Sequence, residues 1–496
     1  MPDGPIRLEA PPHFTPPRLV DLGEGVEVSA PVRSQLTSVY WDTADMRLAR
    51  WGCSLLAVQD GGWEIEFPSL HPTKSRTSDT SAVAGAADHP PEAALDLLRA
   101  YVRTAALRPV AKLRRVRQSV VVGGQGNGST IRVLSDEISI LDGRHVAARY
   151  RELVLDAGRE ADTAVVHGVI ARLRAAGAGG PDLVPEYARV LGPASTEAPE
   201  VVVVEPGPGS TVAQAVGAAI AASVVRLLRH DAAVRQGVEP EGVHQARVAT
   251  RRLRSDLGTF GSLLEAEPTD ALRDELQWLA TLLGEVRDSD VLIERLSSRM
   301  EEIPGPASGR RALLQRLGAR REAARTRLLA GIRSQRYAVL LDGLVAIAVT
   351  PPLSTDGDRP ATEVLPRLVT RPWGRLVKAV ERLGDDSADE DLHAVRIAAK
   401  RARYAAEAVA PVVGKPAHRF AEGVAALQQS LGDYNDTVVA RQWLGEVASR
   451  LGAGGAFYAG VLTERERLLG EDALRRWRSA WKQVNRKKLH GWMTGD

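Results

Sequence analysis

Cysteine and aromatic residues are scarce in this chain. Cys53 is its one cysteine among 496 residues, and aromatic residues make up 4% of it. A single cysteine excludes an intramolecular disulfide framework and a cysteine-rich zinc site, and it fits a reducing cytoplasm, where we expect the protein to reside. The shortage of aromatic residues disfavours proteins that bind single-stranded nucleic acid by stacking on its bases.

Long apolar runs and a secretory signal are lacking too. The N-terminal segment MPDGPIRLEAPPHF has neither the basic segment nor the apolar run of a signal peptide. The most apolar stretch starts at Val212 and is interrupted by Gln214 and Arg226, so we expect a buried bundle helix and no membrane association. The formal net charge of +3 says little about partners, and local charge patterns are more informative.

A basic segment is written twice in the second part of the chain. HQARVATRRLRSDLGTF (His244 to Phe260) returns as HAVRIAAKRARYAAEAV (His393 to Val409). At about 100° per residue, a helix places the histidine and most of the cations of each copy on one face and the apolar residues on the opposite face. We call these faces the two basic stripes. The first contains His244, Arg247, Arg251 and Arg254, with Arg252 at its edge, and the second contains His393, Arg396, Lys400 and Arg403, with Arg401 at its edge.

An acidic segment is repeated at nearly the same offset, as LGEVRDSDV from Leu283 and LGDYNDTVV from Leu431. Repeats of about 150 residues are too long for a solenoid, so we expect two related helical bundles whose basic stripes meet at a common surface. The repeated carboxylates could hold magnesium or could pair with the arginines, and we favour pairing. These carboxylates are Glu285, Asp288, Asp433 and Asp436.

The basic stripes favour an anion site over a solvated helix face. They hold cations and histidine without interleaved acids, so the side chains repel one another unless an anion lies over them. The first stripe has no aromatic residue and the second offers only Tyr404 for stacking on a base, and Gln245 alone is weak support for a duplex-reading helix. A ligand made entirely of phosphate fits better, because arginine binds phosphate oxygens bidentately and lysine adds charge. Each histidine could contact phosphate, cap its helix or be buried. A metal site is less favoured, because neither has a second ligand at i+3 or i+4.

Composition divides the chain into two domains and a linker. Short alternating runs bounded by glycine and proline predict a β-rich α+β domain over residues 1–192. Proline, glycine and small residues surround a four-valine run in the linker, residues 193–210, and the valines are expected to form an edge strand or to pack on a neighbour. Helical patterns follow over residues 211–491.

The helical part resembles the CHAD domain, the conserved histidine α-helical domain. The resemblance rests on both histidine segments, both acidic segments and RSQRY, and it covers about Thr211 to Gly491. It implies an all-α domain of two pseudo-symmetric four-helix bundles that binds inorganic polyphosphate. The implied ligands are the ten residues of the two basic stripes.

The N-terminal part resembles the CYTH or triphosphate-tunnel domain, through LEAPPHF, VYWDTADMRLARWGCSLL, GGWEIEFP and RYRELVLD. That resemblance implies an antiparallel β-barrel with a Glu-x-Glu-x-Lys signature, for which this chain has Asp3, Pro5 and Arg7. Ala57 and Val58 replace expected basic residues, and Glu64 and Glu66 place acids where they would repel a triphosphate. Some charged residues are retained, and the basic ones could be tunnel cations or an exposed strand edge. They are Lys112, Arg114, Arg115, Arg117 and Glu152.

The sequence therefore predicts a cytoplasmic protein, associated with polyphosphate granules, that binds inorganic polyphosphate through the basic stripes, with a degenerate tunnel-like domain, no catalysis and no cofactor. Two alternatives are a metal-dependent triphosphatase fed by the helical domain, and an adaptor for nucleic acid or an acidic protein. The preferred chain length of polyphosphate, the cellular partner and the oligomeric state stay open.

Overall fold

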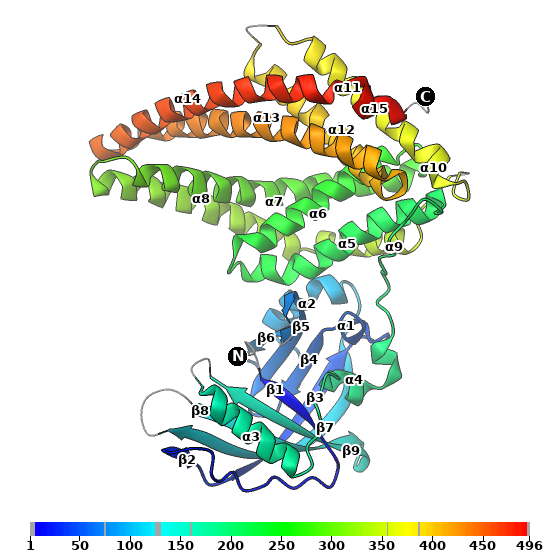
Figure 1. Ribbon diagram of the computed structural model, residues 1–496, viewed down its shortest axis with the longest axis vertical. Coiled ribbons are helices and arrows are strands. Elements are labelled where there is room, and N and C mark those ends of the chain that lie inside the picture. Colours follow the sequence, from blue (N-terminus) through cyan, green and yellow to red (C-terminus); the bar gives the residue numbers. More distant parts are fainter. Residues whose placement is uncertain are drawn as a thin grey trace. The chain divides into compact units, whose positions relative to one another are not determined.

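The computed structural model describes residues 5–73, 76–124, 130–158, 161–354, 356–384 and 387–493 (Figure 1). Asp3 of the degenerate signature lies outside the described residues. The chain forms two compact units, Met1–Pro199 and Glu200–Asp496. We call them the β unit and the helical unit.

The β unit is built on one antiparallel sheet in which the strands follow the order β1-β9-β8-β7-β3-β4-β5-β6, with β2 paired to β7. Tight turns join β4 to β5 at Gly61–Gly62 and β8 to β9 at Gly143, as expected for hairpins. The strands are β1 (Ile6–Ala10), β2 (Val26–Val28), β3 (Val32–Asp42), β4 (Ser54–Val58), β5 (Gly62–Thr73), β6 (Arg76–Val83), β7 (Arg108–Gly124), β8 (Thr130–Asp142) and β9 (His145–Ala157).

Side-chain alternation gives the sheet an apolar outer face. In β8, Ile131 and Val133 join the core around helix α3, whereas Asp136 and Ile138 lie on the opposite, inner face. The side chain of Asp162 caps α3 by accepting a hydrogen bond from the backbone N–H of Ala164. The short helices of this unit are α1 (Arg47–Arg50), α2 (Glu92–Val102), α3 (Thr163–Ala175), α4 (Glu186–Leu191) and the 3₁₀ helix η1 (Pro193–Thr196).

The inner face of the sheet has an apolar cluster that is covered by helix α4. Tyr40, Leu56, Leu113 and Ile138 pack there with Val190 of α4. The sheet curls, since Arg7 on β1 lies close enough to Glu66 on β5 to interact with it electrostatically. Among the described residues β1 pairs with β9 and β6 with β5, so the sheet is a curled one whose first and last strands are not joined by hydrogen bonds.

The helical unit contains two successive groups of helices. In each group, consecutive long helices pack against one another: α5 to α8 in the first and α11 to α14 in the second. The helices are α5 (Val212–Gln236), α6 (Pro240–Thr259), α7 (Ala266–Glu301), α8 (Ala307–Arg333), α9 (Gln335–Val349), α10 (Ala361–Val364), η2 (Leu365–Val369), α11 (Thr370–Glu381), α12 (Asp389–Val413), α13 (Lys415–Ala448), α14 (Ala453–Val484), α15 (Lys487–His490) and η3 (Gly491–Met493).

The two groups share a hydrophobic core. Leu292 and Leu296 of α7 and Leu313 of α8 pack with Trp443 of α13 and Leu462 of α14. The helix layers of the two groups can be followed in Figure 1. The predicted pair of pseudo-symmetric helical bundles is confirmed, and the bundles are joined by common packing.

Helix α5 corresponds to the apolar stretch that starts at Val212. By length and composition alone it could cross a membrane, but 56% of its most apolar window is buried in the protein. A capping box formed by Thr211 and Gln214 begins the helix, and Gly237, with φ 62°, ends it. These features are typical of a core helix of a helical bundle.

Candidate anion-binding site

The two basic stripes lie on helices α6 and α12, which contact each other across the two groups. Their opposite faces are buried through small residues, including Ala246 and Ala249 of α6 and Ala399 and Ala402 of α12. The predicted meeting of the two stripes at a common surface is supported by their charges, because Arg247 and Arg251 of α6 act electrostatically on Lys400 of α12.

Four cations of the stripes form a central cluster, with Arg247 and Arg251 from α6 and Arg396 and Lys400 from α12. Burial, followed by the charges of Arg396, Arg251 and Arg247, lowers the pKa of Lys400 to about 7. Burial also lowers the pKa of Arg396, and Arg247 contributes to that shift. The cluster therefore holds like charges close together in a partly buried place, which is unfavourable without an anion.

The remaining cations of the stripes lie on either side of this cluster. Arg252 of α6 forms ion pairs with Asp256, at 3.2 Å, and with Glu407 of α12, which also binds Arg403 at 2.6 Å. Arg254 of α6 lies near Arg401 of α12, whose charge helps burial to lower the Arg254 pKa. Since Arg252 corresponds to Arg401 and Arg254 to Arg403 in the repeat, the two contacts are related by an approximate twofold axis.

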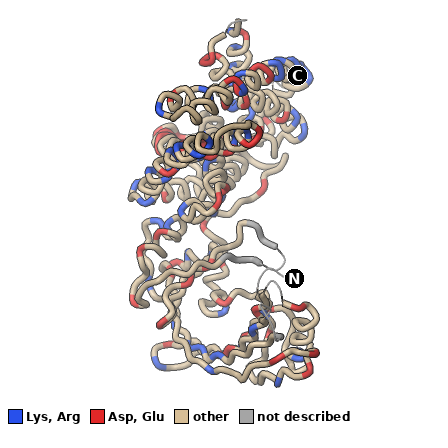
Figure 2. Tube along the Cα trace, turned by 90° about the vertical axis from the view of Figure 1, so that its left-hand side faces the viewer, with Lys and Arg blue, Asp and Glu red and all other residues tan. Residues whose placement is uncertain are grey.

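Several stripe cations lack a carboxylate partner. Arg247 has one in Asp288, at 3.1 Å. In the part of the chain that the structure describes, five others form no ion pair, and they are Arg251, Arg254, Arg396, Lys400 and Arg401. Basic and acidic positions along the helices can be compared in Figure 2.

The repeated acidic segments lie beside the stripes and divide their carboxylates between two roles. Asp288 binds Arg247, and Asp436 lies near Arg396, which partly offsets the rise of the Asp436 pKa caused by burial. Glu285 and Asp433 instead pair with arginines of the outer helices, Arg327 of α8 at 2.8 Å and Arg476 of α14 at 3.0 Å. Pairing with a stripe arginine is thus observed for Asp288, whereas Asp436 interacts with Arg396 electrostatically and forms no ion pair with it in the described part of the chain. No cluster of three potential metal-ligating side chains occurs within the described ranges.

Arg247 and Arg396 lie near glycines at equivalent places of the two groups. A Cβ atom at Gly284 would lie 3.8 Å from Arg247 Nε, and one at Gly432 would lie 3.9 Å from Arg396 Nε. These are ordinary van der Waals distances, so both guanidinium groups lie beside equivalent positions of α7 and α13. This equivalence shows that the duplication extends to side-chain positions.

The two histidines have different surroundings. His393 is exposed, and its Nδ1 lies 2.8 Å from Asn435 Oδ1. Half-buried His244 has Arg287 near it at the position equivalent to Asn435, and burial together with the Arg287 charge lowers the pKa of His244. The N-cap residues are Glu239 for α6 and Ala388 for α12, so the helix-capping alternative is wrong for both histidines.

Comparison with known proteins identifies the family. The uncharacterized proteins Rv2226 and MT2285 of Mycobacterium tuberculosis strains are each 31% identical over 486 residues, which span 92% of this chain and 91% of theirs. A family model described as the CHAD domain matches residues 218–445. Residues 218–445 of this chain therefore form a CHAD domain.

Two solved structures resemble this chain. PptA from Streptomyces chartreusis is 24% identical, with a TM-score of 0.47, over 55% of this chain and 100% of that chain. The CHAD domain from the plant Ricinus communis is 28% identical, with a TM-score of 0.44, over 60% of this chain and 96% of that chain.

Some residues of the CHAD site were not predicted from the sequence. Arg287 and Glu407 lie outside the stripes and act on the stripe residues His244 and Arg252. Asn435 lies against His393, and Arg295 interacts with Asp436 of the second acidic segment. The repeated acidic segments contain Arg287 and Asn435 at equivalent places, and this was a usable signal. Arg295 and Glu407 have no equivalent charged residue in the other copy, since Trp443 and Gly258 stand there.

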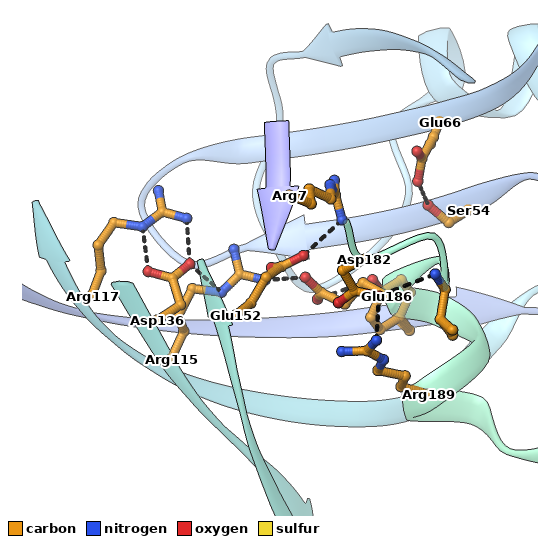
Figure 3. Close-up of polar contacts among 12 residues, drawn as sticks. Arg7, Ser54, Glu66, Arg115, Arg117, Asp136, Glu152, Asp182, Glu186 and Arg189 are labelled. Carbon is orange, nitrogen blue, oxygen red and sulfur yellow. Dashed lines mark hydrogen bonds and ion pairs between the residues drawn. The ribbon is translucent and has the colours of Figure 1, made fainter. Parts of the chain in front are cut away.

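The β unit, outside the CHAD domain, contains a second set of arginines that point to the inner face of its sheet (Figure 3). Arg117 binds Asp136 through two bonds of 2.8 and 2.7 Å, and Arg115 lies 3.4 Å from the same carboxylate. Arg115 also donates to Glu186 of α4 at 2.5 Å. Every one of these contacts joins a cation to a carboxylate of the same unit.

The edge of this network is formed by β1 and β5. Arg7 donates to Glu152 at 2.8 Å, while Glu66 accepts a long hydrogen bond of 3.5 Å from the hydroxyl of Ser54 and Glu64 is exposed. Pro5 of the degenerate signature is exposed. The retained inner cations are thus bound by carboxylates of the β unit itself.

The strand that carries the retained cations lies inside the sheet. β7 is hydrogen-bonded to β3 on one side and to β8 on the other. The alternative that Lys112 to Arg117 form an exposed strand edge is therefore wrong. Arg115 and Arg117 point inward, and Lys112 and Arg114 lie on the other face.

Proposed function

We propose that this protein binds inorganic polyphosphate through the two basic stripes of its CHAD domain and does not catalyse its hydrolysis. The observation that carries the proposal is the central cluster of Arg247, Arg251, Arg396 and Lys400. These four side chains come from two helices and from both copies of the repeat, and burial with mutual repulsion holds the pKa of Lys400 at about 7. A polyanion that neutralises these charges removes their mutual repulsion, and this favours binding.

The surroundings of the stripes favour phosphate over bases as the recognised group. Tyr404, the aromatic side chain beside the stripe cations, is 7% exposed, and the guanidinium groups of Arg251 and Arg403 lie over its ring at 5.3 Å and 5.8 Å. A covered ring offers no open face on which a base could stack. Arginine and lysine side chains recognise phosphate oxygens without reading a base.

The β unit supports the part of the proposal that concerns catalysis. Metal-assisted phosphoryl transfer needs carboxylates that hold the ion and cations that stabilise the charge on the transferred phosphoryl group. In the β unit, Asp136 and Glu152 bind Arg115, Arg117 and Arg7. Groups that satisfy one another are not available to a metal ion or to a triphosphate.

The test is a comparison of four ligands on the full chain, with salt as the variable. Long-chain polyphosphate, tripolyphosphate, single-stranded DNA and RNA are titrated side by side between low and physiological salt. By analogy with nucleic acids, each neutralised phosphate should contribute roughly 0.7 to 0.9 to the slope of log affinity against log salt. We expect long-chain polyphosphate to bind most tightly, with a steep slope.

Three results would change the proposal. Binding that does not depend on salt would exclude the basic stripes as the source of affinity. RNA that binds as tightly as polyphosphate at matched charge would favour an adaptor for nucleic acid. Release of phosphate from tripolyphosphate with magnesium or manganese would assign catalysis to the chain.

A further inference from the structure

Tyr404 lies where the two basic stripes meet. It is on α12, it is 7% exposed, and its ring lies against a guanidinium group from each stripe, Arg251 of α6 and Arg403 of α12. Cation–π contacts of this kind restrict where a guanidinium group can lie. The ring therefore helps to position two cations of the proposed site.

The hydroxyl group of Tyr404 has a separate property. It is buried and has no hydrogen-bond partner among the described residues, and the same is true of Nε of Arg396, about two turns earlier on the helix. Tyr404 also contributes electrostatically to the pKa of both Arg396 and Arg251, so its hydroxyl group lies near both. Buried tyrosine hydroxyl groups usually do have a partner.

The neighbours of this hydroxyl group define what kind of partner it can take. Arg251, Arg396 and Arg403 carry only hydrogen-bond donors, so none of them can accept a hydrogen bond from the phenol. Asp436, the carboxylate nearest to Arg396 in electrostatic terms, forms no hydrogen bond with Tyr404. A partner must therefore bring an acceptor oxygen into a cationic neighbourhood, and an anionic oxygen fits best.

We propose that the Tyr404 hydroxyl group donates a hydrogen bond to an oxygen of a bound phosphoryl group, as a neutral contact among the charged ones. This inference rests on the proposed function and names one further ligand-contacting residue of that site. The first copy of the repeat has Ser255 at the equivalent position. The phenol is thus supplied by one half of the site, and the ligand meets two halves that differ.

The test uses Tyr404→Phe in the full chain, because this change keeps the ring and removes the hydroxyl group. We expect affinity for long-chain polyphosphate to fall about tenfold at every salt concentration, since a hydrogen bond to a charged group is lost. The slope of log affinity against log salt should not change, because a neutral donor releases no counterions. The free protein should be as stable as the wild type or more stable, because a buried group without a partner has been removed.

Arg251→Gln is the matched control for the salt slope. It removes a charge beside the same ring, so its slope should fall by roughly 0.7 to 0.9 while affinity also decreases. Tyr404→Leu removes the ring as well and should weaken binding more than Tyr404→Phe. Thermal unfolding of each variant checks that the helical unit stays folded.

The outcomes separate this inference from the proposed function. If the wild type binds polyphosphate with a steep salt slope and Tyr404→Phe binds equally well, the hydroxyl contact is overturned and the function stands. A Tyr404→Phe slope that falls like that of Arg251→Gln would also overturn it, because the hydroxyl group would then act through an arginine. A wild type that does not bind polyphosphate would overturn both.

Discussion

The β unit and the CHAD domain contain the same kind of residue in opposite electrostatic conditions. On the inner face of the β unit, burial lowers the pKa of Arg115, but Glu186 and Asp136 outweigh it and raise that pKa above its usual range. In the CHAD domain, burial lowers the pKa of Arg251 and of Arg396, and neighbouring carboxylates do not restore either. An arginine that is paired with carboxylates stabilises the fold. An arginine that is surrounded by cations has no such partner, and an anionic ligand could supply one.

The largest effect on stability should come from removing the carboxylate that binds two arginines of the β unit. Asp136 is fully buried and binds both Arg115 and Arg117. Asp136→Ala leaves two guanidinium groups without their partner, and we expect the free energy of unfolding of the β unit to fall by about 3 to 5 kcal/mol. Urea unfolding, followed by hydrogen exchange at the backbone amides of β7 and β8, measures the change.

Asp142→Ala is the control, because this residue lies at the exposed end of the same strand. A surface substitution of this kind should change stability by no more than about 0.5 kcal/mol. If the two variants were equally stable, the inner network would not be structural, and its arginines would have to be reconsidered as ligand-binding groups.

The next largest effect should come from reversing charge in the CHAD cluster. Arg247→Glu with Arg251→Glu on α6, and separately Arg396→Glu with Lys400→Glu on α12, should each weaken polyphosphate binding by at least about 100-fold, or about 2.7 kcal/mol, at low salt. Isothermal titration or fluorescence anisotropy measures the affinity. The chain should stay folded, because these side chains already repel one another.

The matched control reverses two cations elsewhere. Arg310 and Arg311 are exposed on α8 and form no ion pair in the described part of the chain. Arg310→Glu with Arg311→Glu makes the same change in net charge and should cost less than about threefold in affinity. A stripe pair that behaved like this control would show that the two helices do not share a site.

A smaller effect should come from pH. Lys400 has a pKa of about 7 in the free protein, with Arg396, Arg251 and Arg247 as the cations and Asp436 as the carboxylate that face it. A bound polyanion favours the charged lysine, so binding takes up a proton and affinity should decrease as pH rises above 7, by up to about tenfold per pH unit. Lys400→Arg keeps the charge at all these pH values and should remove this dependence.

Lys400 should also make the stability of the free protein depend on pH, in the opposite direction to its effect on affinity. The unfolded chain binds a proton at Lys400 above pH 7, where the folded chain does not, so this residue makes the folded state more stable as pH rises. Thermal unfolding without ligand and affinity with long-chain polyphosphate, both measured at pH 6 to 9, should therefore change in opposite directions. A pH dependence of affinity that persists in Lys400→Arg would point to His244 or to another group.

The last prediction is that the β unit neither binds nor hydrolyses tripolyphosphate. In a variant with all four cluster cations replaced by glutamate, tripolyphosphate with magnesium or manganese should neither stabilise the β unit nor be hydrolysed. Glu64→Gln with Glu66→Gln serves as the control in the wild-type background. Phosphate release that disappears in this control would mean that the β unit has rebuilt a metal site from β5, and the non-enzymatic proposal would be withdrawn.

The helical fold and the stripe positions could be predicted because the duplication carries them in the sequence. A repeated spacing of His, Arg and Lys fixes which side chains share a helix face, whatever the helix packs against. Contacts such as Glu407 with Arg252 could not be predicted, because they depend on how two helices far apart in sequence cross.

The β unit was predictable in its strands and less so in its interior. Alternation in β8 and β9 is local, and so it appears in the sequence. The place of β7 between β3 and β8, and the position of Glu186 on the inner face, follow from tertiary packing. For this reason an exposed edge and an inner row of cations could not be distinguished for Lys112 to Arg117 from the sequence.

The approximate twofold relation between α6 and α12 has a consequence for how such a site can change. Two copies of a single repeat, associated as a homodimer, would have to present the same residue twice at each position around the axis. Fusion of the copies into one chain releases that constraint, and the chain has used the freedom at Arg251 and Lys400, at Ser255 and Tyr404, and at Arg287 and Asn435. One titrating lysine and one phenol can thus face a ligand whose own repeating units are all alike.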